Sequence, residues 1–168
     1  MSNLNADEKT WLKKYDELAK RFSAHYLASK ERTMESMKKA MEKAREEIVS
    51  AKEFTVQQSE ELKSFLQRDL EQTLNDFHQL SEDARNRLNF KKLEAGALRS
   101  IASVLENTGS ALQEIGKKAK KAIVCHTGEI TSAGTLTCEA CGETLHFERT
   151  ARVPPCPKCK KTSFTKSL

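Results

Sequence analysis

The stretch "CEACGETLHFERTARVPPCPKC", from Cys138 to Cys159, carries two Cys-x-x-Cys pairs. Two residues between paired cysteines allow a tight turn that points both sulfurs at one ion, and two such turns complete a tetrahedron with Zn–S distances of about 2.3 Å. The segment between the pairs is long enough for one strand out and one strand back. The sequence therefore predicts one structural Zn²⁺ ion with these ligands: Cys138, Cys141, Cys156 and Cys159.

Short runs of β-branched and aromatic residues flank the cysteine pairs, and they predict a small β zinc ribbon. Three strands are expected: residues 135–137, 143–148 and 162–166. Leu145 and Phe147 alternate onto one face of the second strand. Because so small a region has few apolar side chains, metal binding must supply most of its folding free energy, about 10 to 16 kcal/mol in comparable zinc peptides.

The alternatives to a structural metal site are a redox centre, a disulfide framework and a catalytic metal. The first residues, "MSNLNADEKTWLKKYDEL", are charged, and the chain contains no long apolar run, so we expect a cytoplasmic protein that does not enter the membrane. Thiols are kept reduced in the cytosol, which favours metal over disulfides. A thioredoxin-like motif needs a βαβ setting, and a catalytic zinc needs an open coordination position that four thiolates do not leave.

The first half of the chain is predicted to be helical, because residues 1–95 contain neither glycine nor proline. Two apolar seams recur at helical spacing: Trp11, Tyr15, Leu18 and Phe22, then Met34, Met37, Met41, Ala44 and Ile48. The two seams differ in phase, so a bend or a break is expected within Leu27–Thr33, with Ser29 or Thr33 as a possible cap.

Three further helical segments are expected. Thr55 and Gln58 have the spacing of a capping box, which predicts a helix from about Val56. Its apolar face comprises Leu62, Phe65, Leu66, Leu70, Leu74, Phe77, Leu80, Ala84 and Leu88. The next segment carries Leu98, Ile101, Val104 and Leu105, and a second capping box, Ser110 with Gln113, would restart the helix.

These patterns predict a mainly α fold with a small β region at the end. Residues 1–124 are expected to form a long antiparallel helical hairpin or a three-helix, coiled-coil-like bundle, and residues 125–168 the zinc ribbon. An elongated homodimer, with each seam buried against a second chain, is the alternative arrangement. No Pro/Gly/Ser-rich linker separates the two parts, so a stiff junction is expected.

The charge pattern leaves nucleic acid open as a partner. The chain has 29 basic and 24 acidic residues, and this modest excess does not itself indicate nucleic-acid binding. Two basic runs, residues 117–121 and 158–166, could form one surface, and Phe164 or Phe147 could stack on a base. The competing interpretation is that the lysines are solvated and that both phenylalanines form the small core of the ribbon.

Several polar residues lie outside the cysteine pairs. Cys125 is interpreted as a small, partly buried residue at a helix end. His126 and Glu129 are expected to bond to backbone or to each other where the chain turns, in a structural role. His146 is expected to face solvent, and His25 lies on the apolar seam that contains Trp11.

No convergent set of acid, base and nucleophile is apparent. His78 has Asp76, Glu82 and Asp83 nearby, a pattern more typical of a solvated helix face. We therefore expect a non-enzymatic, zinc-binding interaction protein that presents its ribbon on a helical scaffold to a protein partner. The alternatives are a nucleic-acid-binding regulator using residues 117–121 and 158–166, and a thiol redox sensor that acts by releasing zinc.

Residues 126–142, "HTGEITSAGTLTCEACG", together with "PCPKC" at 155–159 and the helical lead-in, resemble the bacterial zinc-ribbon-containing family typified by YbeL. The positions in the family's order are His126, Gly128, Glu129, Gly134, Leu136 and the four cysteines. Within Thr55–Glu71 the resemblance is looser and covers "TxxxxEEL" and "RDLE". It implies an N-terminal helical segment and a C-terminal zinc ribbon, and it implies no activity. Lys160 departs from the glycine that often follows a second cysteine pair.

Overall fold

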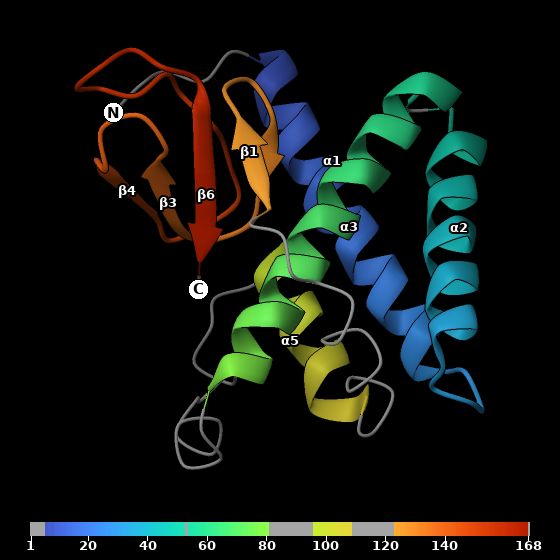
Figure 1. Ribbon diagram of the computed structural model, residues 1–168. Coiled ribbons are helices and arrows are strands. Elements are labelled where there is room, and N and C mark those ends of the chain that lie inside the picture. The colour runs from blue at the N-terminus through green and yellow to red at the C-terminus, as the bar shows by residue number, and fades with distance from the viewer. Residues whose placement is uncertain (1–5, 53, 81–95, 109–122, 168) are drawn as a thin grey trace.

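The computed structural model describes residues 6–52, 54–80, 96–108 and 123–167, and these form a mainly α chain with a small antiparallel β region at its end (Figure 1). The four helices described are α1 (Ala6–Leu27), α2 (Met34–Ser50), α3 (Val56–Gln79) and α5 (Ala97–Thr108). The predicted fold class is confirmed at this level. The hairpin and the coiled-coil-like bundle remain predictions.

Two capping boxes fix where helices begin. The predicted break within Leu27–Thr33 separates α1 from α2, and the Thr33 hydroxyl accepts the Ser36 N–H at 3.2 Å. At the start of α3, the Thr55 hydroxyl accepts the Gln58 N–H at 3.2 Å, and the Gln58 side chain accepts the Thr55 N–H at 2.9 Å. Each box gives partners to N–H groups that the first turn of a helix leaves unpaired.

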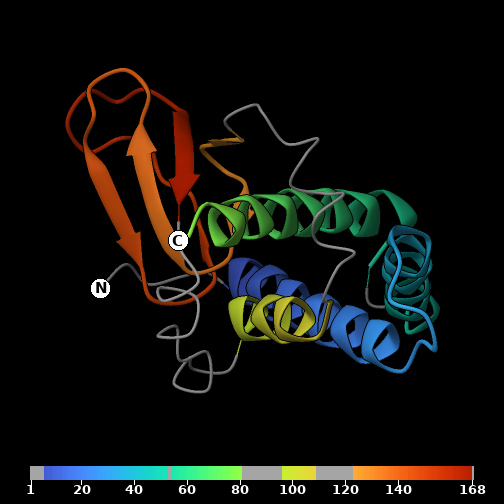
Figure 2. The ribbon, with the colours of Figure 1, turned by 60° about the horizontal axis from the view of Figure 1, so that its bottom comes forward.

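The apolar seams of the helices face one another inside the chain. The largest fully buried side chains of this core are Tyr15, Phe22, Tyr26, Leu18, Met41, Ile48, Leu62, Leu66, Leu74, Ile101 and Leu105. Burying one such aliphatic or phenylalanine side chain contributes about 1.5 to 3 kcal/mol. α5 lies along α1 and closes one side of the core (Figure 2). In the described residues, the seams of the first three helices are thus covered within a single chain.

The β region consists of two antiparallel sheets. β1 (Val124–His126), β6 (Ser163–Ser167), β3 (Gly134–Cys138) and β4 (Thr144–Phe147) form one sheet in that order, and β2 (Ile130–Thr131) pairs with β5 (Ala151–Arg152). β3, β4 and β6 confirm the three predicted strands. Leu145 and Phe147 pack against the ribbon core, and His146 between them is exposed, both as predicted.

The remaining strands, β1, β2 and β5, were not predicted. Cys125, which was predicted at a helix end, is instead the central residue of β1, fully buried and opposite Phe164 of β6. The β-branched Ile123 and Val124 before it favour an extended backbone. A strand of three residues is too short for its alternation to be distinguished from the end of a helix.

The β region packs against one side of the helical core, and α2 lies on the opposite side in both views (Figures 1 and 2). Ile130 of β2 is fully buried and belongs to the helical core, so the two parts share apolar contacts. The boundary predicted between residues 124 and 125 remains a prediction. Within the described ranges, no helix is both long enough and apolar enough to cross a membrane.

Candidate metal centre

The four predicted ligands come together at one end of the four-stranded sheet. Their sulfur atoms lie within 4.8 Å of one another, with Cys138 Sγ 3.5 Å from Cys159 Sγ and Cys141 Sγ 3.6 Å from Cys156 Sγ. All four thiols are free of disulfides. A tetrahedron with Zn–S bonds of about 2.3 Å separates its sulfurs by about 3.8 Å, so the donor set matches zinc in type and spacing.

Two similar turns position the sulfurs. In the first, the Gly142 N–H donates to the Cys138 carbonyl at 2.9 Å, and in the second the Lys160 N–H donates to the Cys156 carbonyl, also at 2.9 Å. Gly142 has φ 72° and Lys160 has φ 62°. Lys160 therefore adopts the left-handed conformation that glycine usually supplies, and the second turn keeps its geometry despite the departure from the family pattern.

The electrostatics of the cluster favour a bound cation. Backbone N–H groups of Cys159 and Lys158 lower the pKa of Cys156 to about 7, which favours the thiolate form of this cysteine. Although the Glu143 N–H acts to lower the pKa of Cys141, desolvation and the neighbouring sulfurs raise it to about 12. Four sulfurs this close cannot all ionise unless a positive ion offsets their repulsion. Zinc would supply that charge, and its four positions would all be filled by protein.

The other end of the ribbon is held to the helices by a buried carboxylate, Asp69 of α3. Asp69 is 0% exposed, and its Oδ2 lies 3.0 Å from Lys166 Nζ of β6. The same oxygen accepts the Tyr15 hydroxyl at 2.6 Å and the Ser132 N–H at 2.5 Å. Arg68 Nη2 donates to Asp69 Oδ1 at 3.0 Å. Asp69 therefore joins α1, α3 and the ribbon.

Burial raises the pKa of Asp69, but the charges of Lys166 and Arg68 outweigh burial and hold it below its ordinary value. The pKa of Tyr15 is raised well above its ordinary value by burial and then by the Asp69 charge, so its hydroxyl stays a donor. Burial lowers the pKa of Lys166 although Asp69 opposes this. The group is thus an anion surrounded by donors and cations, as a buried charge requires.

A second set of bonds uses the two polar residues that the sequence singled out. Glu129 Oε2 accepts the His126 N–H at 2.8 Å and Arg68 Nη1 at 2.5 Å, while Arg68 Nη2 also donates to the Ile130 carbonyl at 2.7 Å. His126 and Glu129 are therefore bonded to each other at the turn, as expected. Sequence reasoning missed the buried charge cluster of Arg68, Asp69 and Lys166. The "RDLE" element, which contains Arg68 and Asp69, was the available signal for the first two.

The predicted nucleic-acid surface loses two of its members. Phe164 is 0% exposed and lies in the ribbon core, so it offers no face to a base, and Lys166 is buried against Asp69. Lys158, Lys160 and Lys161 are exposed. Outside the described residues lie the basic run 117–121, Ser110 and Gln113, Glu82 and Asp83, Ala84 and Leu88, and the side chain of His78.

Two cysteine turns at the end of a small antiparallel sheet define a zinc-ribbon protein. The chain belongs to the family described as "Zinc-ribbon containing domain", whose model matches residues 24–167, and this confirms the resemblance. The protein YbeL, titled uncharacterized, from Escherichia coli K12 and O157:H7, is 25% identical over 128 residues, which cover 74% of this chain and 78% of YbeL. No solved structure matches the chain significantly.

The positions on which the resemblance rests have physical roles in this chain. A Cβ atom added at Gly134 would lie 2.8 Å from the Ser167 carbonyl oxygen, so the close approach of β3 and β6 requires glycine there. Leu136 is fully buried in the ribbon core. His126 and Glu129 form the turn that Arg68 binds. Apart from the cysteines, these residues serve packing or the joint between ribbon and helices. The joint is the set of contacts that Arg68 and Asp69 of α3 make with Glu129, Ser132 and Lys166, together with the bond from Thr150 to Asp16 of α1.

Proposed function

We propose that the protein is a non-enzymatic zinc protein of the cytosol that carries one structural zinc ion in its ribbon and presents the ribbon to a protein partner. The observation that carries the proposal is the use of the charged groups beside the ribbon. Arg68, Asp69, Glu129 and Lys166 bond to one another and to backbone across the joint. These groups hold the ribbon in a fixed position on the helices, which is what a presenting scaffold needs.

The ribbon end beyond the cysteines is the surface proposed for the partner. Five residues around the second cysteine pair are exposed there: Pro154, Pro155, Pro157, Lys158 and Lys161. Proline fixes φ and lowers the entropy lost on binding, so such a surface is suited to protein contact without local reordering.

Site-specific photo-crosslinking in cells tests the proposal. A benzophenone amino acid replaces Lys161 at the ribbon end or, as the matched control, Lys38, an exposed lysine of α2 on the opposite side of the core. A discrete adduct formed from position 161 and absent from position 38 is the expected result. The adduct should disappear when Cys138→Ser is combined with the probe. Equal adducts from both positions, or none from position 161, would overturn the proposal.

Nucleic-acid binding is the second candidate, supported by the exposure of Lys158, Lys160 and Lys161. Binding through backbone phosphates weakens steeply with salt. Fluorescence anisotropy with a labelled single-stranded oligonucleotide, at low and moderate salt, checks it. Equal anisotropy with and without protein at low salt removes this candidate, and a salt-dependent rise that is lost when the three lysines become alanine supports it.

Zinc release on oxidation is the third candidate, and it rests on the close approach of the sulfurs of Cys138 and Cys159. Thiolates are the form that oxidants attack. Dilute hydrogen peroxide, followed by a colorimetric zinc assay, tests it. Release within minutes, reversed by a thiol reductant and added zinc, supports a sensor, and retention of zinc over hours contradicts it.

A further inference from the structure

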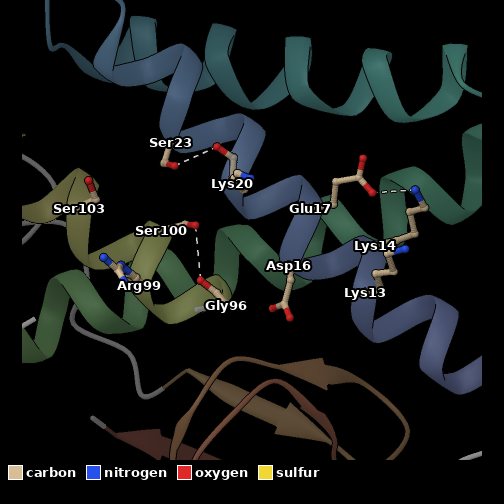
Figure 3. A pocket seen from close by; sticks show the side chains of 10 residues that line it. All are labelled: Lys13, Lys14, Asp16, Glu17, Lys20, Ser23, Gly96, Arg99, Ser100 and Ser103. Atoms are coloured by element: carbon tan, nitrogen blue, oxygen red, sulfur yellow. Dashed lines mark hydrogen bonds and ion pairs between the residues drawn. The ribbon is translucent and has the colours of Figure 1, made fainter. Parts of the chain in front are cut away.

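A groove of about 870 Å³ lies between α1 and α5 (Figure 3), and no cysteine is among the described residues that line it. It is hollow because small residues line its walls, among them Ser23 on α1 and Gly96, Ser100 and Ser103 in and before α5. Figure 3 shows lysine side chains from α1 on one side and Arg99 from α5 on the other. The groove therefore combines open space, hydroxyl groups and cations from two helices.

The two carboxylates in the groove already have partners. Asp16 Oδ1 accepts the Ala97 N–H at 2.9 Å, so Asp16 caps the start of α5. The same oxygen accepts the hydroxyl of Thr150, which links α1 to the ribbon. Glu17 accepts Lys14 at 2.7 Å and also Arg21. Lys14 and Arg21 lower the pKa of Glu17, which keeps it ionised and bound to them. Glu17 is therefore neutralised by its two cationic partners, whereas Asp16 is bonded to uncharged donors and keeps its charge. The four cations that line the groove still outnumber its two carboxylates.

Three cations of the groove are left over. Lys13, Lys20 and Arg99 are exposed, and none of them forms an ion pair with a carboxylate in the part of the chain that the structure describes. Unpaired like charges around one hollow raise the local potential and attract anions.

The spacing of the cations indicates a ligand with more than one anionic group. Lys13 and Lys20 are two helical turns apart, which corresponds to about 10 Å along α1. Arg99 approaches from the other helix, and guanidinium matches phosphate oxygens in geometry. Ser103 also lines the groove and can donate a hydrogen bond, whereas the Ser100 hydroxyl donates to the Gly96 carbonyl at 3.4 Å. One phosphate group cannot contact all three cations, whereas a chain of phosphates can.

We propose that this groove binds a small-molecule anion with two or more phosphate groups. Its recognition is by charge and hydroxyl donors, because no aromatic side chain is among the described residues that line the groove. A nucleobase would find no stacking platform there. The site does not involve the cysteines, and the proposal does not rest on the proposed protein partner.

Isothermal titration calorimetry of the full zinc-loaded chain tests the site with tripolyphosphate, inorganic phosphate and ATP as probes. Tripolyphosphate should bind at least tenfold more tightly than phosphate, because it reaches cations on both walls. ATP should match tripolyphosphate within about threefold if the base makes no contact. Zinc content measured after each titration, together with amide NMR shifts confined to α1 and α5, distinguishes groove binding from removal of zinc by the probe.

Single substitutions locate the binding. Lys20→Ala and Arg99→Ala should each weaken tripolyphosphate binding by about tenfold, the loss expected for one charge-assisted contact. Lys20→Arg should retain most of the affinity. Lys38→Ala, which removes an exposed lysine from α2, is the matched control and should change nothing. The proposal is overturned by the absence of saturable binding at millimolar probe, by equal affinity for phosphate and tripolyphosphate, or by an equal loss in the Lys38 control.

Discussion

The two ends of the ribbon are held by opposite means. At the end formed by Cys138 and Phe164, four sulfurs converge within 4.8 Å of one another, the arrangement of a zinc-binding site. At the end formed by Leu136 and Lys166, no metal is needed, because Asp69 of the helices supplies the counter-charge. From this difference we expect a β region with a minimal core to be stabilised at one end by metal ligation and at the other by the contacts of Asp69 with the helices.

The ends also differ in how far along the sequence their partners lie. Each cysteine turn closes within five residues, as in the bond from Gly142 to Cys138. The joint brings Asp69 and Ser132 together across 63 residues, and Thr150 and Asp16 across 134. Loss of the metal should therefore remove one end and leave the other standing, whereas loss of the joint should weaken the attachment of the whole ribbon.

Removing one ligand should have the largest effect. Cys138→Ser is expected to abolish zinc binding and to unfold the cysteine end, while far-UV circular dichroism retains the helical signal, since the helices have their own core. Metal analysis and amide NMR measure both quantities. Cys125→Ser is the matched control and should keep its zinc, because Cys125 is buried in the ribbon core but is not one of the four converging thiols. Full zinc occupancy in Cys138→Ser would contradict the four-cysteine site.

Breaking the joint should have the next largest effect. Asp69→Ala leaves Lys166 buried without its counter-charge, and we expect the free energy of unfolding to fall by about 3 to 5 kcal/mol with zinc retained. Chemical denaturation monitored by circular dichroism gives the value. Glu61→Ala, an exposed carboxylate on the same helix, should change stability by less than about 0.5 kcal/mol. If Asp69→Ala/Lys166→Met is as unstable as Asp69→Ala, the ion pair is not the cause.

Acid should weaken the joint through the same carboxylate. Lys166 and Arg68 hold the pKa of Asp69 below its unfolded value of about 3.9, so its stabilising contribution is complete above about pH 5 and is lost as the pH falls through the folded pKa. The stability difference between the wild type and Asp69→Asn should therefore shrink towards low pH. Zinc loss affects both proteins and cancels in the difference. A constant difference down to pH 3 would exclude this role.

Neutralising Glu129 should have a smaller effect on the joint. Glu129→Gln keeps an acceptor for the His126 N–H but removes the charge opposite Arg68, so we expect a loss of about 1 to 2 kcal/mol. NMR relaxation should show one correlation time for ribbon and helices in the wild type and faster ribbon motion in the variant. A ribbon that already tumbles separately in the wild type would refute the stiff junction.

Exchanging the residues with positive φ in the two cysteine turns should have the smallest effect on stability. Lys160→Gly should stabilise the ribbon by about 0.5 to 1 kcal/mol, because glycine adopts positive φ without a Cβ clash, and Gly142→Lys should destabilise it by a similar amount. Space is not the limit at Gly142, since a Cβ there meets nothing within 4 Å. Thermal unfolding of the zinc-loaded proteins measures both. Shifts of the same sign would show that the turns are not equivalent.

The features that sequence reasoning found are local. The four cysteines predicted as zinc ligands and the Thr55 capping box are each defined by spacings of a few residues. In the structure the four sulfurs converge and the capping box forms. Leu145 and Phe147 followed from period-two alternation in one strand. Such patterns depend on backbone geometry that a short segment specifies by itself.

The features that it missed depend on long-range contacts. Lys166 looked like part of a basic run, and only its position opposite Leu136 at the helix-facing end of β6 brings it to Asp69. Cys125 was misplaced because three strand residues carry no clear period. A charged residue is buried only when tertiary structure supplies its partner, and spacing along the chain does not reveal that partner.

Trp11 gives the molecule an optical probe of its own cooperativity. It is the single tryptophan of the chain, its ring lies edge-on to Phe54 with 4.9 Å between ring centroids, and it packs against the helical core. Its emission therefore reports helix packing and not the ribbon directly. The emission of Trp11 before and after chelation of zinc tests whether the ribbon and the helices are coupled. Unchanged emission would indicate that the helical core keeps its packing when the metal is removed. A shifted emission would indicate that loss of the metal alters helix packing through the contacts of Asp69.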